Sequence, residues 1–195
     1  MSARTLQVGV VGLGRIGRRH AEQLAHRTRH CEVTAVCSPG DDGAAWAAQE
    51  LGLPHTYRDY DEFLARSGVD AVVIATPTTL HAAQTIAALR AGKHVFVEKP
   101  LSMDAAECEQ VEAVAREHPS QVAMVGFVRR FDPSYANAYA AVQRGEIGKP
   151  FIVRSQTCDK NDPSGYFVRY APKSGGIFMD CSVHDIDLAR WMLGN

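Results

Sequence analysis

The stretch LQVGVVGLGRIG, Leu6–Gly17, decides the fold, because an apolar run leads directly into three glycines spaced as GxGxxG. After a buried strand, the first glycine permits a tight turn and the second lets the backbone approach a pyrophosphate. The third lets a helix pack on the strand, and the N-terminal amides of that helix favour phosphates. The pattern favours a dinucleotide-binding turn over a merely structural one. The expected cofactor contacts in it are Gly12, Gly14, Arg15, Ile16 and Gly17.

Strand-like and helix-like segments alternate along the chain as far as residue 127. The expected strands are Leu6–Gly12, Glu32–Ser38, His55–Tyr57, Val69–Pro77, His94–Pro100 and Val122–Phe127. The expected helices are Ile16–Thr28, Ala44–Leu51, Tyr60–Arg66, Leu80–Ala91 and Asp104–His118. The strands are nearly continuous in Val and Ile, as strands covered on both faces require. We therefore expect an α/β fold, a doubly wound parallel Rossmann sheet, over residues 1–127.

Residues 128–195 follow a different pattern. We expect a helix at Ser134–Arg144, a strand at Phe151–Thr157 and a loop at Asp159–Gly165. A closing helix, Gly175–Asn195, follows the loop. Because one strand and two helices do not enclose a core, we interpret this part as the beginning of a second, α+β domain whose remaining strands are absent.

Composition and charge limit the partners. The formal net charge is -1 and the sequence has no basic block of the kind that binds nucleic acid or anionic membranes, which leaves small molecules. The basic run Arg18–His20 is interpreted as a solvated helix face. Five widely spaced cysteines without a CxxC pair indicate reduced thiols rather than disulfides or a zinc site. No segment approaches the ~18 apolar residues of a membrane helix, and we expect a cytoplasmic protein.

The end of the second expected strand bears on the choice of cofactor. An NAD-selective site normally presents Asp or Glu there to the ribose hydroxyls, whereas this chain has Ser38 followed by PGDD. Ser38 has no charge to repel a 2′-phosphate, and no Arg or Lys follows to attract one. Asp41 and Asp42 can fold back to replace the missing acid. We expect NAD, with NADP left open, because a phosphate without a cation would be poorly held.

Two further strand ends carry polar residues to the edge of the sheet where ligands of open α/β folds bind. The expected cofactor contacts at these ends, together with Ser38, are Ala75, Thr76, Pro77, Glu98 and Lys99. Lys99 is either a surface ion-pair partner or a functional cation; its place over the crevice favours the second, since a cation there lowers the proton affinity of a substrate hydroxyl. We also expect a cis peptide bond between Lys99 and Pro100.

The closing helix carries three ionisable residues on one face. At 100° per residue, Asp180, His184 and Asp187 lie within a narrow arc, and most other directions are apolar. We expect this helix to be buried on most sides and the three residues to line a polar pocket, since burying them without partners is costly. Caps and surface pairs on a half-exposed helix are the alternative. A divalent metal site is less favoured, and we expect none.

Five segments together resemble a known family. They are VGVVGLGRIGRRHA, VVIATPTTLHA, HVFVEKPLS, VGFVRRFDPSY and GGIFMDCSVHDIDLARWMLG. In this combination they resemble the Gfo/Idh/MocA oxidoreductases over essentially the whole chain. The details GFVRRFD and DxxxHDxD are most similar to the inositol 2-dehydrogenases of that family.

The resemblance implies an NAD(P)-dependent dehydrogenase acting on a secondary hydroxyl of a cyclic polyol or sugar. It implies that Lys99, Asp180 and His184 form the catalytic set. His184 would take the hydroxyl proton, Asp180 would orient it and bind a neighbouring hydroxyl, and Lys99 would support the alkoxide. The implied substrate contacts are Arg129, Asp159 and Asp187.

Members of the family are considerably longer than this chain. They carry a large open antiparallel sheet that closes the substrate pocket and makes oligomer contacts, and only its first strand is expected here. The chain is therefore expected to be a truncated fragment, a split gene product or a stand-alone cofactor-binding remnant. With the whole domain present a homo-oligomer is expected. The alternative function is a non-catalytic dinucleotide-binding module.

Overall fold

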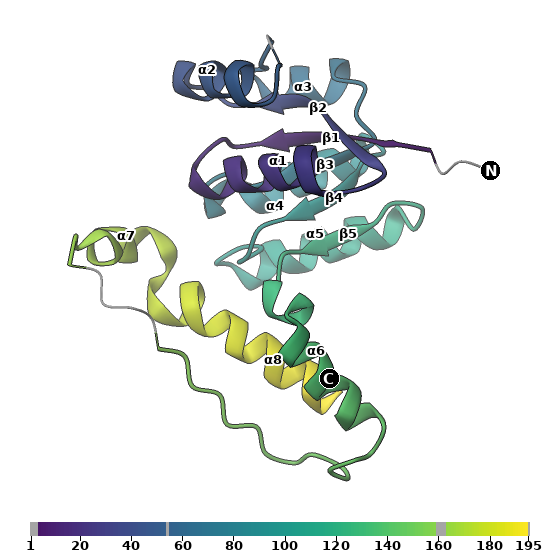
Figure 1. Ribbon diagram of the computed structural model, residues 1–195, viewed down its shortest axis with the longest axis vertical. Helices are drawn as coiled ribbons and strands as arrows, with labels where there is room; N and C mark the ends of the chain where they lie inside the picture. The colour runs from purple at the N-terminus through teal and green to yellow at the C-terminus, as the bar shows by residue number, and fades with distance from the viewer. Residues whose placement is uncertain (1–3, 54, 159–162, 195) are drawn as a thin grey trace. The chain divides into compact units, whose positions relative to one another are not determined.

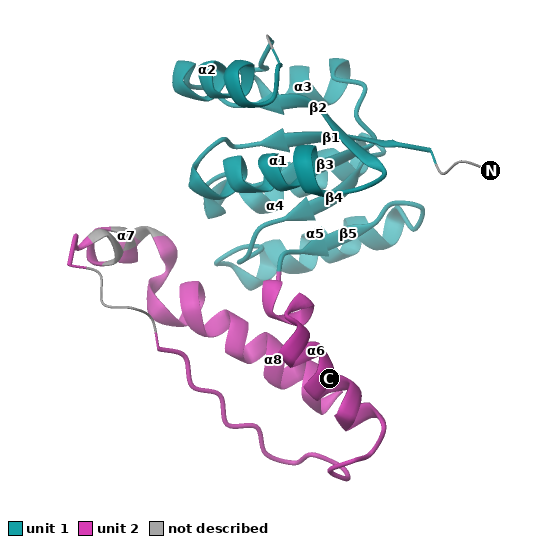
Figure 2. Cartoon of the chain, viewed as in Figure 1, with its two compact units in different colours: residues 1–126 teal, residues 127–195 magenta. Residues whose placement is uncertain are grey.

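A computed structural model describes residues 4–53, 55–158 and 163–194. The chain divides into two compact units, Met1–Gly126 and Phe127–Asn195, coloured separately in Figure 2. Of the described helices, none combines the length and the apolar character needed to cross a bilayer.

The first unit is built on a parallel sheet flanked by helices (Figure 1). Its strands are β1 (Leu6–Val11), β2 (Cys31–Cys37), β3 (Ala71–Ile74), β4 (His94–Val97) and β5 (Ala123–Val125). Their order is β2-β1-β3-β4-β5, and every neighbouring pair is parallel. The chain therefore winds outward to β2 and then crosses to the other side of β1, which confirms the expected doubly wound sheet. The winding reverses between β1 and β3, and the carboxyl ends of these two strands form the switch point at which such sheets bind ligands.

Helices cover both faces of this sheet. They are α1 (Arg15–Arg27), α2 (Asp41–Glu50), α3 (Tyr60–Arg66), α4 (Thr78–Arg90) and α5 (Ala105–Glu117). One buried cluster joins Val8 and Val10 of β1 to α1 and α2. The other joins Val11 to α3, α4 and α5, so alternate residues of β1 enter opposite cores. This two-sided burial is why its strands have continuous apolar sequences.

One expected strand of the first unit does not form. Of His55–Tyr57, Tyr57 alone pairs with the sheet, through an isolated bridge to Cys37. The Tyr57 N–H donates to the Val36 carbonyl at 2.9 Å, and the Ser38 N–H donates to the Tyr57 carbonyl at 2.8 Å. This contact holds the end of β2 in place without adding a strand.

The regular elements in the described part of the second unit are helices. Its elements are η1 (Val128–Phe131), α6 (Pro133–Gln143), α7 (Tyr166–Ser174), the π-helix η2 (Phe178–Ser182) and α8 (Val183–Leu193). Asp132 caps α6, accepting a hydrogen bond from the Ser134 N–H at 2.8 Å, and Pro133 occupies the first helical position. Tyr139 of α6 and Trp191 of α8 stack with ring centroids 4.1 Å apart.

One expected strand of this unit does not form, and one helix is additional to those expected. Phe151–Thr157 is an extended, exposed segment rather than a strand, with Phe151 86% exposed. A strand needs a neighbour for its backbone N–H and C=O groups, and none of the described residues supplies one. The helix α7 was not expected at all; it ends at Gly175, whose φ of +76° is left-handed, as helix C-caps often are.

The closing helix also differs from expectation. It is interrupted by the π turn at Phe178–Ser182 and is not buried on most sides. Ile177, Phe178 and Ile186 are exposed, and of α8 Asp187 and Leu188 are buried. An apolar sequence indicates that a helix can be buried, but it does not supply the neighbours that bury it. In the described part of this unit, the residues that pack on α8 cover one of its sides.

Candidate functional site

The three glycines of the turn have three different roles. Gly12 has a φ of +87° and donates its N–H to the Cys37 carbonyl at 2.8 Å, which fixes the turn. A Cβ on Gly17 would lie 1.7 Å from the Gly12 carbonyl oxygen, so α1 approaches β1 as closely as glycine permits. A Cβ built on Gly14 meets no described atom within 4 Å. The space over Gly14 and the start of α1 therefore suits a pyrophosphate.

The charge at the N-terminus of α1 favours an anionic ligand. The first turn of α1 begins with Arg15 and has no carboxylate in its sequence, so the partial positive charge of the helix N-terminus is not neutralised there. Ile16 and Gly17 follow within the same turn. The residues present thus fit a dinucleotide.

The loop after β3 lies beside the glycine turn. The Ala75 N–H donates to the Val11 carbonyl at 2.8 Å, and Pro77 is the N-cap of α4. The Thr76 hydroxyl donates to the Gln84 side chain at 2.6 Å. His81, a buried residue that the sequence patterns did not single out, contacts the Thr76 carbonyl at 2.9 Å and the Pro100 carbonyl at 2.8 Å. It therefore ties the β3 loop to the loop after β4.

Glu98 and Lys99 follow β4 directly, and the expected cis bond between Lys99 and Pro100 is confirmed. Glu98 contacts the His20 imidazole at 2.7 Å and accepts the Lys99 N–H at 3.1 Å. Burial alone would raise the pKa of the Glu98 carboxyl, but the hydrogen bond and charge of His20, with those of Lys99, hold it below its usual value. His20 also packs edge-on against Phe96, so its interpretation as a solvated residue is wrong.

Two arginines and two aspartates from separate parts of the sequence lie close together at the end of β2. Ser38 is buried there, and α2 begins with Asp41 and Asp42. Arg18 of α1 pairs with Asp42, and Arg58 pairs with Asp41. Arg18 is thus part of this cluster and not simply a solvated residue, and cations do stand near the position of the missing acid.

In the second unit, Asp180 and His184 lie on different kinds of helix. Asp180 belongs to the π turn, and His184 is the second residue of α8. The π turn is wider than an α turn, but four positions still make close to one full turn, so the expected common face of Asp180 and His184 stays a prediction. Both side chains are half-buried, and the His184 ring meets Phe127 edge-on at 6.4 Å. π turns of this kind are frequent at functional sites.

Asp187 is the buried member of an ion pair. It is 8% exposed and accepts from Arg130 through both oxygens, with Nε to Oδ2 at 2.9 Å and Nη2 to Oδ1 at 2.6 Å. This hydrogen bonding raises the pKa of the Arg130 guanidinium, which also lies 5.6 Å from the Trp191 ring centre. Arg130 was not predicted as a site residue from the sequence. The available signal was that two arginines in VRRFD could pair with the two aspartates in HDID.

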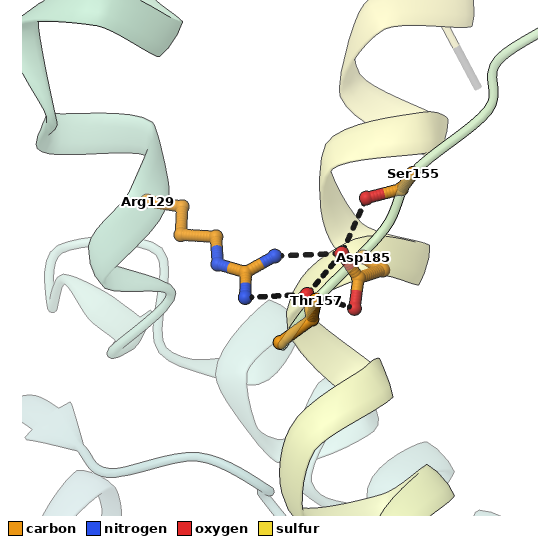
Figure 3. Close-up of polar contacts among 4 residues, drawn as sticks. All are labelled: Arg129, Ser155, Thr157 and Asp185. Atoms are coloured by element: carbon orange, nitrogen blue, oxygen red, sulfur yellow. Dashed lines mark hydrogen bonds and ion pairs between the residues drawn. The ribbon is translucent and has the colours of Figure 1, made fainter. Parts of the chain in front are cut away.

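Arg129 joins a second carboxylate of α8, as Figure 3 shows. Its Nη1 donates to Asp185 Oδ1 at 2.7 Å and its Nη2 donates to the Thr157 hydroxyl at 2.9 Å. Thr157 and Ser155 both hydrogen-bond to Asp185. Burial alone would raise the pKa of the Asp185 carboxyl, but these hydroxyls and Arg129 lower it. Asp185 was not predicted, and Asp159 lies outside the described residues.

The described ranges contain no group of three or more His, Cys, Asp or Glu side chains placed to hold a metal ion.

Comparison with known proteins places these features in a family. Residues 6–127 match the oxidoreductase family with an NAD-binding Rossmann fold, and residues 135–195 match the GFO/IDH/MocA C-terminal domain. The scyllo-inositol 2-dehydrogenase (NAD(+)) of Bacillus subtilis is 40% identical over 97% of this chain and 54% of its own length. Myo-inositol 2-dehydrogenase of Thermotoga maritima is 35% identical over 97% of this chain and 55% of its own length.

Solved structures agree. The scyllo-inositol dehydrogenase from Lactobacillus casei, with bound NAD(H) and scyllo-inositol, aligns with a TM-score of 0.92 at 39% identity, over 98% of this chain and 57% of that one. This chain thus spans about half the length of the relatives it matches. Since the Rossmann match alone covers more than half of the residues, the chain belongs to the GFO/IDH/MocA oxidoreductase family.

Proposed function

We propose that this chain carries the cofactor site and the catalytic residues of an NAD-dependent dehydrogenase, which moves a hydride between a secondary hydroxyl of an inositol-like polyol and nicotinamide. The observation that carries the proposal is the glycine turn, in which Gly12 and Gly17 close the backbone while Gly14 leaves space for a pyrophosphate. The substrate class comes from the relatives, whose names are scyllo- and myo-inositol dehydrogenases. In its broader form, the same proposal covers other cyclic polyols and sugars as substrates.

The bound dinucleotide would supply the hydride acceptor, and the side chains would manage the proton. Oxidation of a carbinol releases one hydride and one proton, and His184 would accept the proton from the hydroxyl oxygen. Asp180 would orient His184 and bind a neighbouring hydroxyl. Lys99 would stabilise the alkoxide as its negative charge develops. These roles follow from the family resemblance of EKP and DxxxH.

Recognition of the other hydroxyls would use Arg129, Asp187 and Asp159. A guanidinium has five N–H donors, and the contacts of Arg129 with Asp185 and Thr157 use two of its nitrogens, which leaves donors for a polyol. Asp187 uses its oxygens on Arg130, yet a carboxylate has about four acceptor positions. We propose residues 1–127 as the dinucleotide domain and 128–195 as the start of the substrate and oligomerisation domain.

The alternative to catalysis is a second function, cofactor binding alone. The chain spans about half of its relatives, and several large apolar side chains of the second unit are exposed. If walls of the substrate pocket are lacking, turnover can be lost while cofactor affinity is kept, because positioning is worth ~7 kcal/mol or more of a barrier. The chain would then be a dinucleotide-binding module.

Two measurements separate these functions. NADH is titrated by its fluorescence, and NADH formation is then followed with NAD and myo-inositol, scyllo-inositol or hexoses. We expect binding, with turnover on an inositol. His184→Ala should reduce turnover far more than NADH affinity, whereas the control His26→Ala, at an exposed position of α1, should change neither. Binding without turnover on any polyol supports the module, and loss of binding contradicts both functions.

A further inference from the structure

The charged cluster at the end of β2 assigns a function to two carboxylates. We propose that Asp41 and Asp42 select NAD over NADP in place of the acid that is missing at Ser38, and that they do so partly by occupying Arg58 and Arg18. This inference rests on the dinucleotide part of the proposed function and deepens it, by naming the residues that read the adenosine end of the cofactor.

Ser38 leaves little room for a strand-end acid on the side of α2. A Cβ on Gly43 would lie 2.5 Å from the Ser38 hydroxyl oxygen and 2.9 Å from its Cβ. The first turns of α2 therefore pack directly on Ser38, which is buried and held through its N–H by the Tyr57 carbonyl. A discriminating carboxylate has to come from a neighbouring position.

Asp41 and Asp42 are those neighbours. They are the first two residues of α2, where a carboxylate is favoured by the helix N-terminus. Their side chains are 87% and 89% exposed, so they face the solvent from which a cofactor arrives. In this fold the end of β2 binds the adenosine ribose, and a 2′-phosphate placed there would meet two like charges. A ribose hydroxyl would instead find two acceptors.

The two arginines are the other half of the cluster. Arg18 is anchored: its Nε donates to the Leu13 carbonyl at 2.9 Å, and its guanidinium lies 5.4 Å from the Trp46 ring centre while it pairs with Asp42. Arg58 pairs with Asp41. A guanidinium near this strand end is what accommodates a 2′-phosphate in NADP-binding relatives of the fold.

Both cations are therefore at the right strand end for NADP but are paired with carboxylates. Exposed ion pairs of this kind are individually weak and sensitive to salt. Their effect on selectivity comes from the sign of the charges: removal of the carboxylates changes the cluster from nearly neutral to cationic. The same change should matter little for NAD, which has no phosphate at this position.

The test is the double variant Asp41→Asn/Asp42→Asn, titrated with NADH and NADPH by fluorescence in the full chain. We expect NADPH affinity to rise about tenfold or more, since relief of like-charge contacts typically has at least this effect, and NADH affinity to change less than about threefold. The matched control is Glu62→Gln/Glu112→Gln, which removes two exposed, arginine-paired carboxylates from other helices. It should leave the ratio of the two affinities unchanged.

Adding Arg58→Ala to the double variant should reduce the NADPH gain, since Arg18 then remains as the single unpaired cation of the cluster. The proposal is overturned if the affinity ratio does not move, if the control moves it equally, or if the gain is undiminished without Arg58. No polyol enters these titrations. A chain that binds NADH but oxidises no inositol would refute the proposed catalysis and still decide this inference.

Discussion

The close approach of α1 to the glycine turn makes Gly17→Ala a decisive substitution. The added Cβ would start 1.7 Å from the Gly12 carbonyl oxygen, whereas real contacts of Cβ atoms are essentially never below 3.0 Å, so α1 or the turn has to move by at least about 1.3 Å. Overpacking costs about 1–3 kcal/mol, and the better helix propensity of Ala returns about 1 kcal/mol. Because the obstacle is backbone rather than a flexible side chain, we expect a net loss of about 2 kcal/mol in unfolding free energy.

The matched control is Gly14→Ala, in the same turn. Its φ of -71° and ψ of -173° suit Ala, and no described atom lies within 4 Å of the new methyl group. Loss of a good N-cap residue should cost at most about 1 kcal/mol. The methyl group would nevertheless occupy the space that we assign to the pyrophosphate, so NADH affinity should fall at least about tenfold, or ~1.4 kcal/mol.

The assays are denaturant unfolding and NADH fluorescence titration of the three proteins. Gly17→Ala should lose both stability and NADH affinity, and Gly14→Ala chiefly affinity. If Gly17→Ala unfolds like the parent chain and binds NADH equally well, helix packing on the turn is not what the glycine provides. If Gly14→Ala keeps its affinity, the backbone approach to the pyrophosphate is misassigned.

Three further predictions concern other side chains. Asp187→Asn should destabilise the second unit by about 2 kcal/mol, less than a fully buried pair because Arg130 is 40% exposed, and hydrogen exchange of the α8 amides would measure it. Glu98→Gln should cost stability at neutral pH. Because the folded-state pKa of Glu98 is lowered, that stability is present above its unfolded pKa and lost below it, so the difference from the parent chain in denaturant unfolding should shrink below about pH 4.3. Burial raises the pKa of the Cys37 thiol to about 12, so iodoacetamide at pH 8 should label exposed Cys158 and reach Cys37 after unfolding, as peptide mass mapping would show.

The fold of the first unit was predictable because local sequence and tertiary environment agree there. Strands buried on both faces have to be apolar throughout, and the GxGxxG spacing has a backbone reason at each glycine, as Gly12 and Gly17 show. The segment Phe151–Thr157 has the same strand-like composition but no partner among the described residues. Strand propensity measures how well a residue fits a sheet, and it does not supply the sheet.

The polar contacts were not predictable in the same way. His20 and Glu98 are 78 positions apart, and Arg130 and Asp187 are 57 apart, so no local pattern relates them. Periodicity indicates which face of its helix a residue occupies, but not which charge stands opposite. His20 was thus interpreted as solvated. The π turn that carries Asp180 was not predicted for a related reason, because no local pattern in the sequence marks it.

The division into two units makes the proposed function separable by experiment. The glycine turn, the end of β2 and Glu98 belong to the first unit, whereas Asp180 and His184 belong to the second. Cofactor affinity should therefore depend on packing within the sheet and its helices, and proton transfer on the π turn and α8. Gly14→Ala and His184→Ala are then complementary: the first should weaken NADH binding, and the second should slow turnover at saturating NAD. Parallel losses of both properties in both variants would contradict this division of labour.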